Sequence, residues 1–136
     1  MIFRTFLGLM ALLFLSCTSS VKPEQVNQIE GYWKIDYISH GSEKFYPRGA
    51  EKLLDFYEIN EMEGIRKKVQ PEFSNKFSVT EDFNNFKIIF EGDNCFIKFQ
   101  TPWDQWTEKI ILLTEEKLIL EHQEKKYHYL KYSDQY

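Results

Sequence analysis

The sequence predicts an all-β protein, an antiparallel meander that closes into a small barrel of eight to nine strands. Three observations indicate this fold. After Gly31, large apolar residues alternate with polar ones, which is the pattern of strands with one buried and one solvated face. Aromatic residues, which favour strands, make up 17% of the chain. Short polar turns separate the runs, and a long meander leaves exposed edges unless it closes or is covered.

The alternation is clearest in three short runs, in which every second residue is apolar. Gly92-Asp93-Asn94 joins two of them at the spacing of a hairpin. We expect the apolar members to point into the barrel, either as core or as the wall of a ligand cavity. These members are Trp33, Ile35 and Tyr37, then Phe86, Ile88 and Phe90, and finally Cys95, Ile97 and Phe99.

Further runs complete the meander. The segment Lys52–Glu63 is ambiguous, because Leu53, Leu54 and Tyr57 recur near helical spacing and fit a helix as well as a strand. The other strands expected are Ile110–Leu113, Leu118–Leu120 and Tyr127–Tyr132, with weaker ones at Lys52–Ile59, Ile65–Val69 and Lys76–Thr80.

The first sixteen residues have the order of a secretory signal, with Arg4, then an apolar run over residues 6–15, then the small Ser16. The run is too short to span a membrane, which takes about 20 residues. Phe14-Leu15-Ser16-Cys17 resembles the lipobox of bacterial lipoproteins. The resemblance implies cleavage before Cys17, a diacylglycerol on its sulfur and an acyl chain such as palmitate on its new amine. An ordinary secreted protein with a free Cys17 is the alternative.

We therefore expect three parts: a signal peptide over 1–16, the lipidated Cys17 with a flexible tether over 17–29, and a barrel domain over 30–136. No acidic residue follows Cys17 directly, and by resemblance to Gram-negative sorting this favours the outer membrane, with the domain facing the periplasm. The expected partner is the membrane, reached through the lipid. A formal net charge of −4 without a basic stripe argues against nucleic acid.

Glu30-Gly31-Tyr32-Trp33 resembles the opening strand of lipocalin-like domains, in which Gly-x-Trp places the Trp across the closed end of the barrel. Residues 110–120 and 126–132 are similar to the closing hairpins of small lipocalin-like lipoproteins of Bacteroidetes-type bacteria. The resemblance implies a lipocalin-like β-barrel with Trp33 as a plug, or else in contact with a ligand. Lipocalins carry a basic residue, usually Arg, over that Trp. The last strand here has no Arg, so Lys126 or Lys131 would supply a weaker cation–π contact.

No set of residues suggests catalysis, and we expect a non-enzymatic protein without cofactor or metal. The sequence has no nucleophile turn of the Gly-x-Ser-x-Gly type. His122 and His128 flank an expected hairpin, but a metal needs further ligands at fixed geometry, so these two and His40 are interpreted as surface residues. Cys95 has no disulfide partner if Cys17 is lipidated, and its alternating run favours a buried, inert thiol.

Two irregular stretches are candidates for recognition. Residues 40–49 carry Tyr46 and Arg48 and are placed to cover the mouth of a barrel. A second stretch carries Trp103 and Trp106, as a recognition surface or as a capping cluster. The expected function is a lipid-anchored envelope binding protein that holds a small apolar ligand or a protein partner in or on the barrel. The alternative is a structural or interaction lipoprotein with a filled core and no small-molecule ligand.

Overall fold

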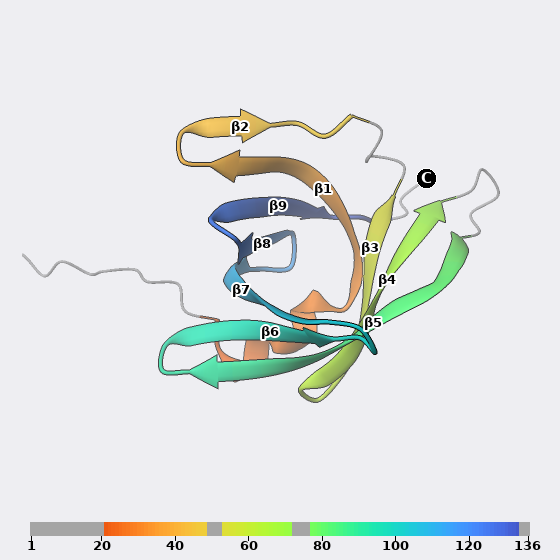
Figure 1. Ribbon diagram of the computed structural model, residues 1–136, viewed down its shortest axis with the longest axis vertical. Coiled ribbons are helices and arrows are strands. Elements are labelled where there is room, and N and C mark those ends of the chain that lie inside the picture. The colour runs from red at the N-terminus through yellow and green to blue at the C-terminus, as the bar shows by residue number, and fades with distance from the viewer. Residues whose placement is uncertain (1–20, 49–52, 72–76, 134–136) are drawn as a thin grey trace, which may run out of the picture.

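One antiparallel sheet of nine strands forms most of the described chain, and it curls until its first and last strands meet (Figure 1). The structure is a computed structural model and describes residues 21–48, 53–71 and 77–133. From β3 onward, neighbours in sequence are neighbours in the sheet, so the chain runs as a meander. The strands are β1 (Gly31–His40), β2 (Glu43–Phe45), β3 (Leu54–Asn60), β4 (Glu63–Pro71), β5 (Phe77–Glu91), β6 (Asn94–Gln100), β7 (Gln105–Leu113), β8 (Lys117–His122) and β9 (Lys125–Lys131).

The barrel closes where β1 pairs with β9. β1 pairs with β3 at its start and with β9 from Trp33 to Ser39, so that it uses both of its edges. Strand β2 is a hairpin extension on the far end of β1, outside the closed ring of the other eight strands. The predicted all-β meander barrel is confirmed, and the segment that also suited a helix contains strand β3.

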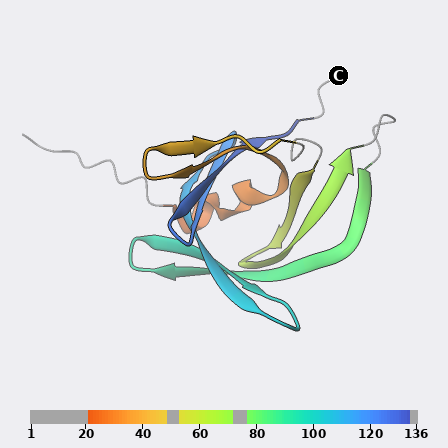
Figure 2. The same ribbon diagram turned by 45° about the horizontal axis from the view of Figure 1, so that its top comes forward.

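A short 3-10 helix, η1 (Pro23–Ile29), covers one end of the ring before β1 begins, and Figure 2 shows it lying within the ring of strands. Val26 and Ile29 are 1% and 0% exposed and belong to the barrel core. We expected these residues at the end of a flexible tether. They are instead part of the folded domain, because their apolar side chains fill the end of the core. Among the described residues, no helix is long and apolar enough to cross a membrane.

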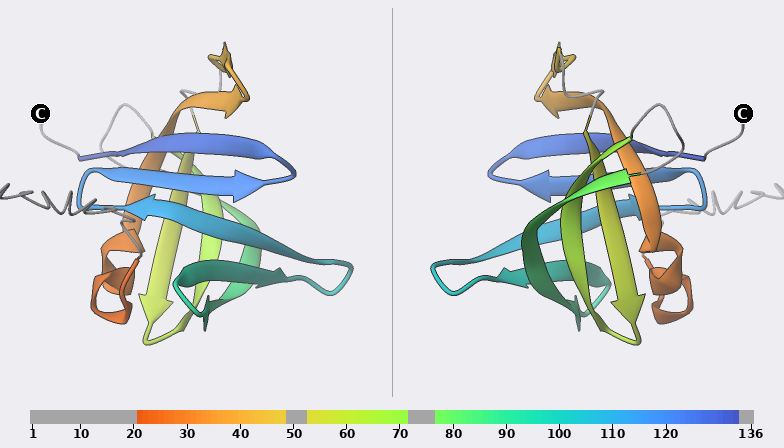
Figure 3. Two further views of the ribbon diagram at one scale, coloured as in Figure 1. Left: turned by 90° about the vertical axis from the view of Figure 1, so that its left-hand side faces the viewer. Right: turned by 90° about the vertical axis from the view of Figure 1, so that its right-hand side faces the viewer.

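The two walls of the barrel cross steeply. In the side views of Figure 3, strands β7 to β9 run across strands β3 to β5, as in an orthogonal packing of two sheets. Large apolar side chains from both walls and from η1 meet between them and form one core. Its buried members are Val21, Val26, Ile29, Trp33, Tyr57, Phe86, Ile88, Cys95, Ile97, Phe99, Ile110, Leu113, Leu118 and Leu120.

A β-bulge in β1 changes which of its residues face inward. The pairing with β9 shifts between Ile35 and Tyr37, so one extra residue is inserted there. Beyond the bulge, Ile38 lines the interior together with Ile35, whereas Tyr37 lies on the outer face. There the ring of Tyr37 stacks on that of His128, with centroids 4.0 Å apart. Strict alternation from Trp33 would place Tyr37 inside, and a single inserted residue reverses its side.

Truncation of Ile29 tests whether η1 belongs to the cooperative core. Ile29→Ala should lower the free energy of unfolding by about 2–5 kcal/mol, because a fully buried side chain leaves a cavity behind. Asn27→Ala, at an exposed position of the same helix, should change it by less than about 0.5 kcal/mol. Urea denaturation followed by tryptophan fluorescence measures both. Small and equal effects of the two substitutions would contradict a structural role for η1.

Candidate functional site

A cavity of about 240 Å³ opens in the barrel at the end away from η1. It lies between the inner faces of β1 and β9 on one side and those of β3 and β4 on the other. Its walls are aromatic and branched aliphatic, and a carboxylate and an ammonium are the only charged groups among them. The lining residues are Trp33, Ile35, Ile38, Pro47, Leu53, Asp55, Lys68, Tyr127 and Tyr129.

The two charged groups of the cavity, Asp55 and Lys68, face each other across β3 and β4. Lys68 Nζ lies 2.5 Å from Asp55 Oδ1, but the two ends of this ion pair differ sharply in exposure. The side chain of Asp55 is 3% exposed, whereas that of Lys68 is 59% exposed. Asp55 Oδ1 accepts no hydrogen bond of good geometry within the described part of the chain. The cavity therefore has a buried carboxylate with unused acceptor capacity.

Trp33 separates the cavity from the closed end of the barrel. Its Nε1 donates a hydrogen bond of 2.7 Å to the carbonyl of Ile29 in η1, which ties the first strand to the helix. Lys131 of β9 places Nζ 4.5 Å from the centroid of the indole and also donates to the carbonyls of Gln28 and Glu30. Burial lowers the pKa of Lys131, and the nearby carboxylate of Glu30 opposes this shift. Of the two lysines considered from the sequence, Lys131 is the one that stacks over Trp33.

A cluster of polar side chains fills the middle of the barrel. Arg66 Nη1 lies 3.2 Å from Glu108 Oε2 and donates to Tyr57 Oη at 3.4 Å. The guanidinium lies over the ring of Phe99, with Cζ 3.9 Å from the centroid. Trp106 Nε1 donates to Glu108 Oε2 at 2.8 Å, so the carboxylate has two donors. This cluster is closely paired and leaves no charge without a partner.

The charge states of the cluster follow from burial and from the neighbouring charges. Burial raises the pKa of Tyr57 and that of Tyr129, so both phenols stay neutral near pH 7. Burial alone lowers the pKa of Arg66, but Tyr57, Glu108 and Asp55 outweigh it, and the pKa is raised overall. Arg66 is therefore a fixed positive charge inside the barrel.

Sequence reasoning missed the polar cluster, although one signal for it is present. Trp106, Glu108 and Ile110 alternate along β7 and share its inner face, so the carboxylate of Glu108 has to point inward. Arg66 occupies the inner position that pairs with Tyr57. Because these charges belong to strands far apart in sequence, their pairing needs the closed barrel.

The residues predicted for a core or a ligand cavity fall into three groups. Trp33, Phe86, Ile88 and Phe99 are buried in the core, and Phe90 packs partly buried against it. Ile35 and Trp33 line the cavity, and Tyr37 lies outside. Cys95 and Ile97, from the same alternating runs, are also buried in the core, so of these inward-facing residues the structure places Trp33 and Ile35 at the cavity.

In each of the two predicted recognition stretches, the structure places nearby residues in different environments. Tyr46 and Arg48 are exposed and do not line the cavity, whereas Pro47 between them does. Trp106 points inward and stacks on Phe99, with centroids 5.1 Å apart. Trp103 lies in the β6–β7 connection and is 93% exposed. Cys17 and the rest of the predicted signal lie outside the described residues.

The remaining candidates for chemistry are dispersed. His122 Nδ1 lies 3.1 Å from the carbonyl of Thr107, and His40 lies near Glu124, so the three histidines do not share a site. In the described ranges, no group of three or more His, Cys, Asp or Glu residues is placed to hold a metal ion. Cys95 is buried, and burial raises its pKa to about 11, so that the thiol stays protonated near pH 7.

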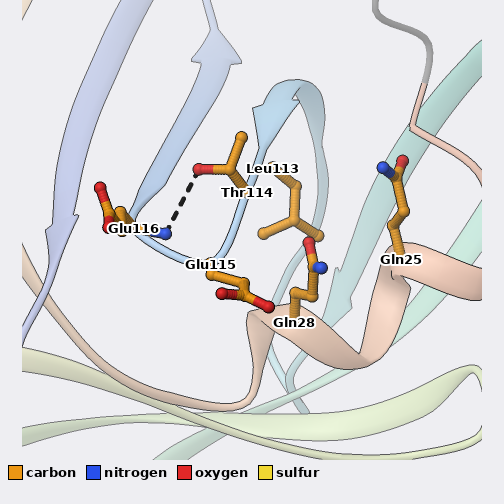
Figure 4. A pocket seen from close by; sticks show the side chains of 6 residues that line it. All are labelled: Gln25, Gln28, Leu113, Thr114, Glu115 and Glu116. Carbon is orange, nitrogen blue, oxygen red and sulfur yellow. Dashed lines mark hydrogen bonds between the residues drawn. The ribbon is translucent and has the colours of Figure 1, made fainter.

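A second hollow, of about 370 Å³, lies outside the barrel between η1 and the β7–β8 turn (Figure 4). It is open and has a polar lining without aromatic rings. Glu116 N donates to Thr114 Oγ1 at 3.3 Å there, and the side chains of Glu115 and Gln28 lie side by side. The lining residues are Gln25, Gln28, Leu113, Thr114, Glu115 and Glu116. The cavity beside Asp55 is less open and has aromatic walls, so it is the better candidate for a ligand site.

No protein-family model matches the chain, and no curated protein matches it. A solved lipocalin-like protein from Bacteroides uniformis is 12% identical, with a TM-score of 0.48, over 77% of this chain and 99% of that one. A solved uncharacterized protein from Bacteroides eggerthii is 13% identical, with a TM-score of 0.48, over 76% of this chain and 98% of that one. At these values the fold class rests on the strand pairing itself, which defines a closed up-and-down barrel of eight strands with β2 as an extension.

Breaking the Arg66–Glu108 pair should be costly. Arg66→Met should lower the free energy of unfolding by about 3–5 kcal/mol, because the carboxylate stays buried without its cation. Adding Glu108→Leu to this variant should restore part of the loss, since neither charge then remains. Lys87→Met, which breaks the exposed Lys87–Glu63 pair, should cost at most about 1 kcal/mol. Urea denaturation measures all three, and a double variant less stable than Arg66→Met would contradict the assignment.

Proposed function

We propose that this protein is a lipid-anchored binding protein of the cell envelope that holds one small ligand in the mouth of its barrel. The observation that carries the proposal is the cavity beside Asp55, with its mostly apolar lining. Ligand pockets commonly combine apolar walls with a few polar groups that fix orientation. Trp33, Tyr127 and Tyr129 provide such walls here. An eight-stranded barrel of this kind is also a fold whose interior often holds one small ligand.

The size of the cavity limits the ligand. The lower end of common ligand pockets is about 300 Å³. The cavity measures about 240 Å³, because Trp33 and the Arg66–Glu108 cluster occupy the rest of the interior. A cavity of about 150 Å³ is known to take up benzene. The ligand we propose is therefore little larger than one aromatic ring with a short side chain.

The anchor is proposed from the N-terminal sequence. The run Phe14-Leu15-Ser16-Cys17 supports lipid on Cys17, and the absence of an acidic residue directly after it supports an outer-membrane location with the domain facing the periplasm. Two or three acyl chains hold a protein stably on a membrane, whereas one gives marginal binding.

The proposal assigns no catalytic role. Ser39 Oγ and His128 Nε2 lie 3.0 Å apart, and burial lowers the pKa of His128, so this imidazole is neutral near pH 7. However, this pair lies on the outer face of the barrel and does not line the cavity. Acyl transfer also needs a bound substrate and donors for an oxyanion. A role in binding accounts for the observations with fewer assumptions.

A second candidate function is the docking of a protein partner, with no small ligand in the barrel. The observation that favours it is the exposed indole of Trp103. Thr101 Oγ1 accepts hydrogen bonds from the backbone N–H groups of Trp103 and Asp104, at 3.3 and 2.9 Å, which holds the turn in one shape. Exposed aromatic side chains on ordered turns are common at interfaces.

Native mass spectrometry of the gently extracted full chain tests the binding function. The protein should carry an additional small mass, because the cavity is apolar and open to a ligand. Ile38→Trp, which fills the cavity, should abolish this mass. Leu130→Trp, on the exposed face of β9, should retain it. Absence of additional mass in the unmodified protein and both variants would favour the partner-docking function.

Substitution of Cys17 tests the anchor. Cys17→Ala should move the protein from the membrane fraction to the soluble fraction, because it removes the only lipid attachment site proposed. Cys95→Ala removes the other thiol of the chain and should leave the protein in the membrane fraction. Fractionation and immunoblotting measure both. A Cys17→Ala protein that stays with the membrane would overturn the lipoprotein assignment.

A further inference from the structure

We propose that the cavity takes a small organic cation, a primary ammonium joined to one aromatic or branched apolar body, with the ammonium held by Asp55. The inference rests on the proposed binding function and names the ligand class for the same site. Four observations support it. They are the lack of a well-aligned hydrogen bond to Asp55 Oδ1, the exposure of Lys68, the charges already present in the interior and the volume of the cavity.

Asp55 provides the buried acceptor for the ammonium. Its side chain is 3% exposed, and it lines the cavity. Oδ1 has Lys68 Nζ nearby but accepts no hydrogen bond of good geometry within the described part of the chain. Buried carboxylate oxygens normally accept several hydrogen bonds, and a missing bond costs free energy. A donor that enters the cavity would meet this requirement.

Lys68 holds the position that the ligand's ammonium would take. Its side chain is 59% exposed, so its ammonium can return to water by rotation of a flexible stem. Exchange of the Lys68 ammonium for that of a ligand therefore keeps Asp55 paired and leaves the Lys68 side chain at its exposed position.

A negatively charged ligand fits the charged groups of the cavity less well than a cation does. It would have to attract Lys68 away from Asp55 and would leave the buried carboxylate unpaired beside a second negative charge. The other cation of the interior, Arg66, is held by Glu108 at 3.2 Å and is not available to an anion. Aromatic rings such as those of Trp33, Tyr127 and Tyr129 attract cations over their faces and not anions.

The apolar lining and the volume set the rest of the ligand. A cavity of about 240 Å³ exceeds the roughly 150 Å³ that holds benzene by enough for a short chain with a terminal group. Ile35 and Ile38 on β1 and Tyr127 on β9 provide the apolar surface against which a ring would pack. 2-Phenylethylamine has this size and charge and serves as the probe, with 2-phenylethanol and phenylacetate as its neutral and anionic counterparts.

The test is isothermal titration calorimetry of the full chain in nonionic micelles, with empty micelles as the baseline. 2-Phenylethylamine should bind more tightly than 2-phenylethanol, and phenylacetate should bind least tightly. Asp55→Asn keeps the shape and removes the charge. It should weaken binding of the amine about 10-fold or more and leave binding of the alcohol unchanged. Glu58→Gln makes the same chemical change at an exposed position of β3 and should alter neither.

A second variant gives the opposite effect and does not depend on Asp55→Asn folding well. Lys68→Met removes the ammonium that competes for Asp55, so amine binding should become several-fold tighter. Tightest binding by phenylacetate, or amine binding unaffected by Asp55→Asn, would overturn the ammonium inference while the binding function stands. If none of the three probes binds at millimolar concentration, the binding function fails together with the inference.

Discussion

Closure of the sheet between β1 and β9 is the constraint on which the other features depend. It pairs every strand of the ring on both edges and removes the exposed edges of an open meander. It also places Trp33 opposite Lys131 on one side and opposite Asp55 on the other. The same two strand pairings therefore put a cation over the indole at the closed end and a carboxylate beside it at the cavity.

The interior holds two ion pairs of different character. Arg66 and Glu108 are both nearly buried, Trp106 donates a further hydrogen bond to Glu108 and Tyr57 accepts one from Arg66, so this pair is a fixed part of the core. Asp55 and Lys68 form a pair with one end buried and the other in water. Lys68 stays exposed if another cation takes its place beside Asp55, whereas a cation that replaced Arg66 would leave the guanidinium in a region of low dielectric. Under the proposed binding function, this difference separates the part of the interior that supports the fold from the part that takes the ligand.

Period-two alternation was enough to predict the fold class, because half-buried strands impose it directly. It also identified Trp33, Phe86 and Phe99 as inward-facing residues. The alternation predicted the wrong face for Tyr37, because the residue types give no indication of the β-bulge. It failed again at Val26 and Ile29, whose segment is too short to show a helical period. The alternation could not identify Asp55 and Arg66 as inward-facing charged residues. Their partners lie on other strands, and only closure of the barrel brings them together.

The burial of Val21 has a consequence for how the domain would sit on a bilayer. Val21 packs in the same core as Val26 and Ile29, so a buried residue of the barrel lies only four positions after Cys17. An extended chain covers at most about 3.6 Å per residue, and four steps reach roughly 14 Å. With lipid on Cys17, the helix-covered end would stand close to the headgroups. The opening beside Asp55 would then point toward the aqueous compartment, and solutes dissolved there would have the direct route to it.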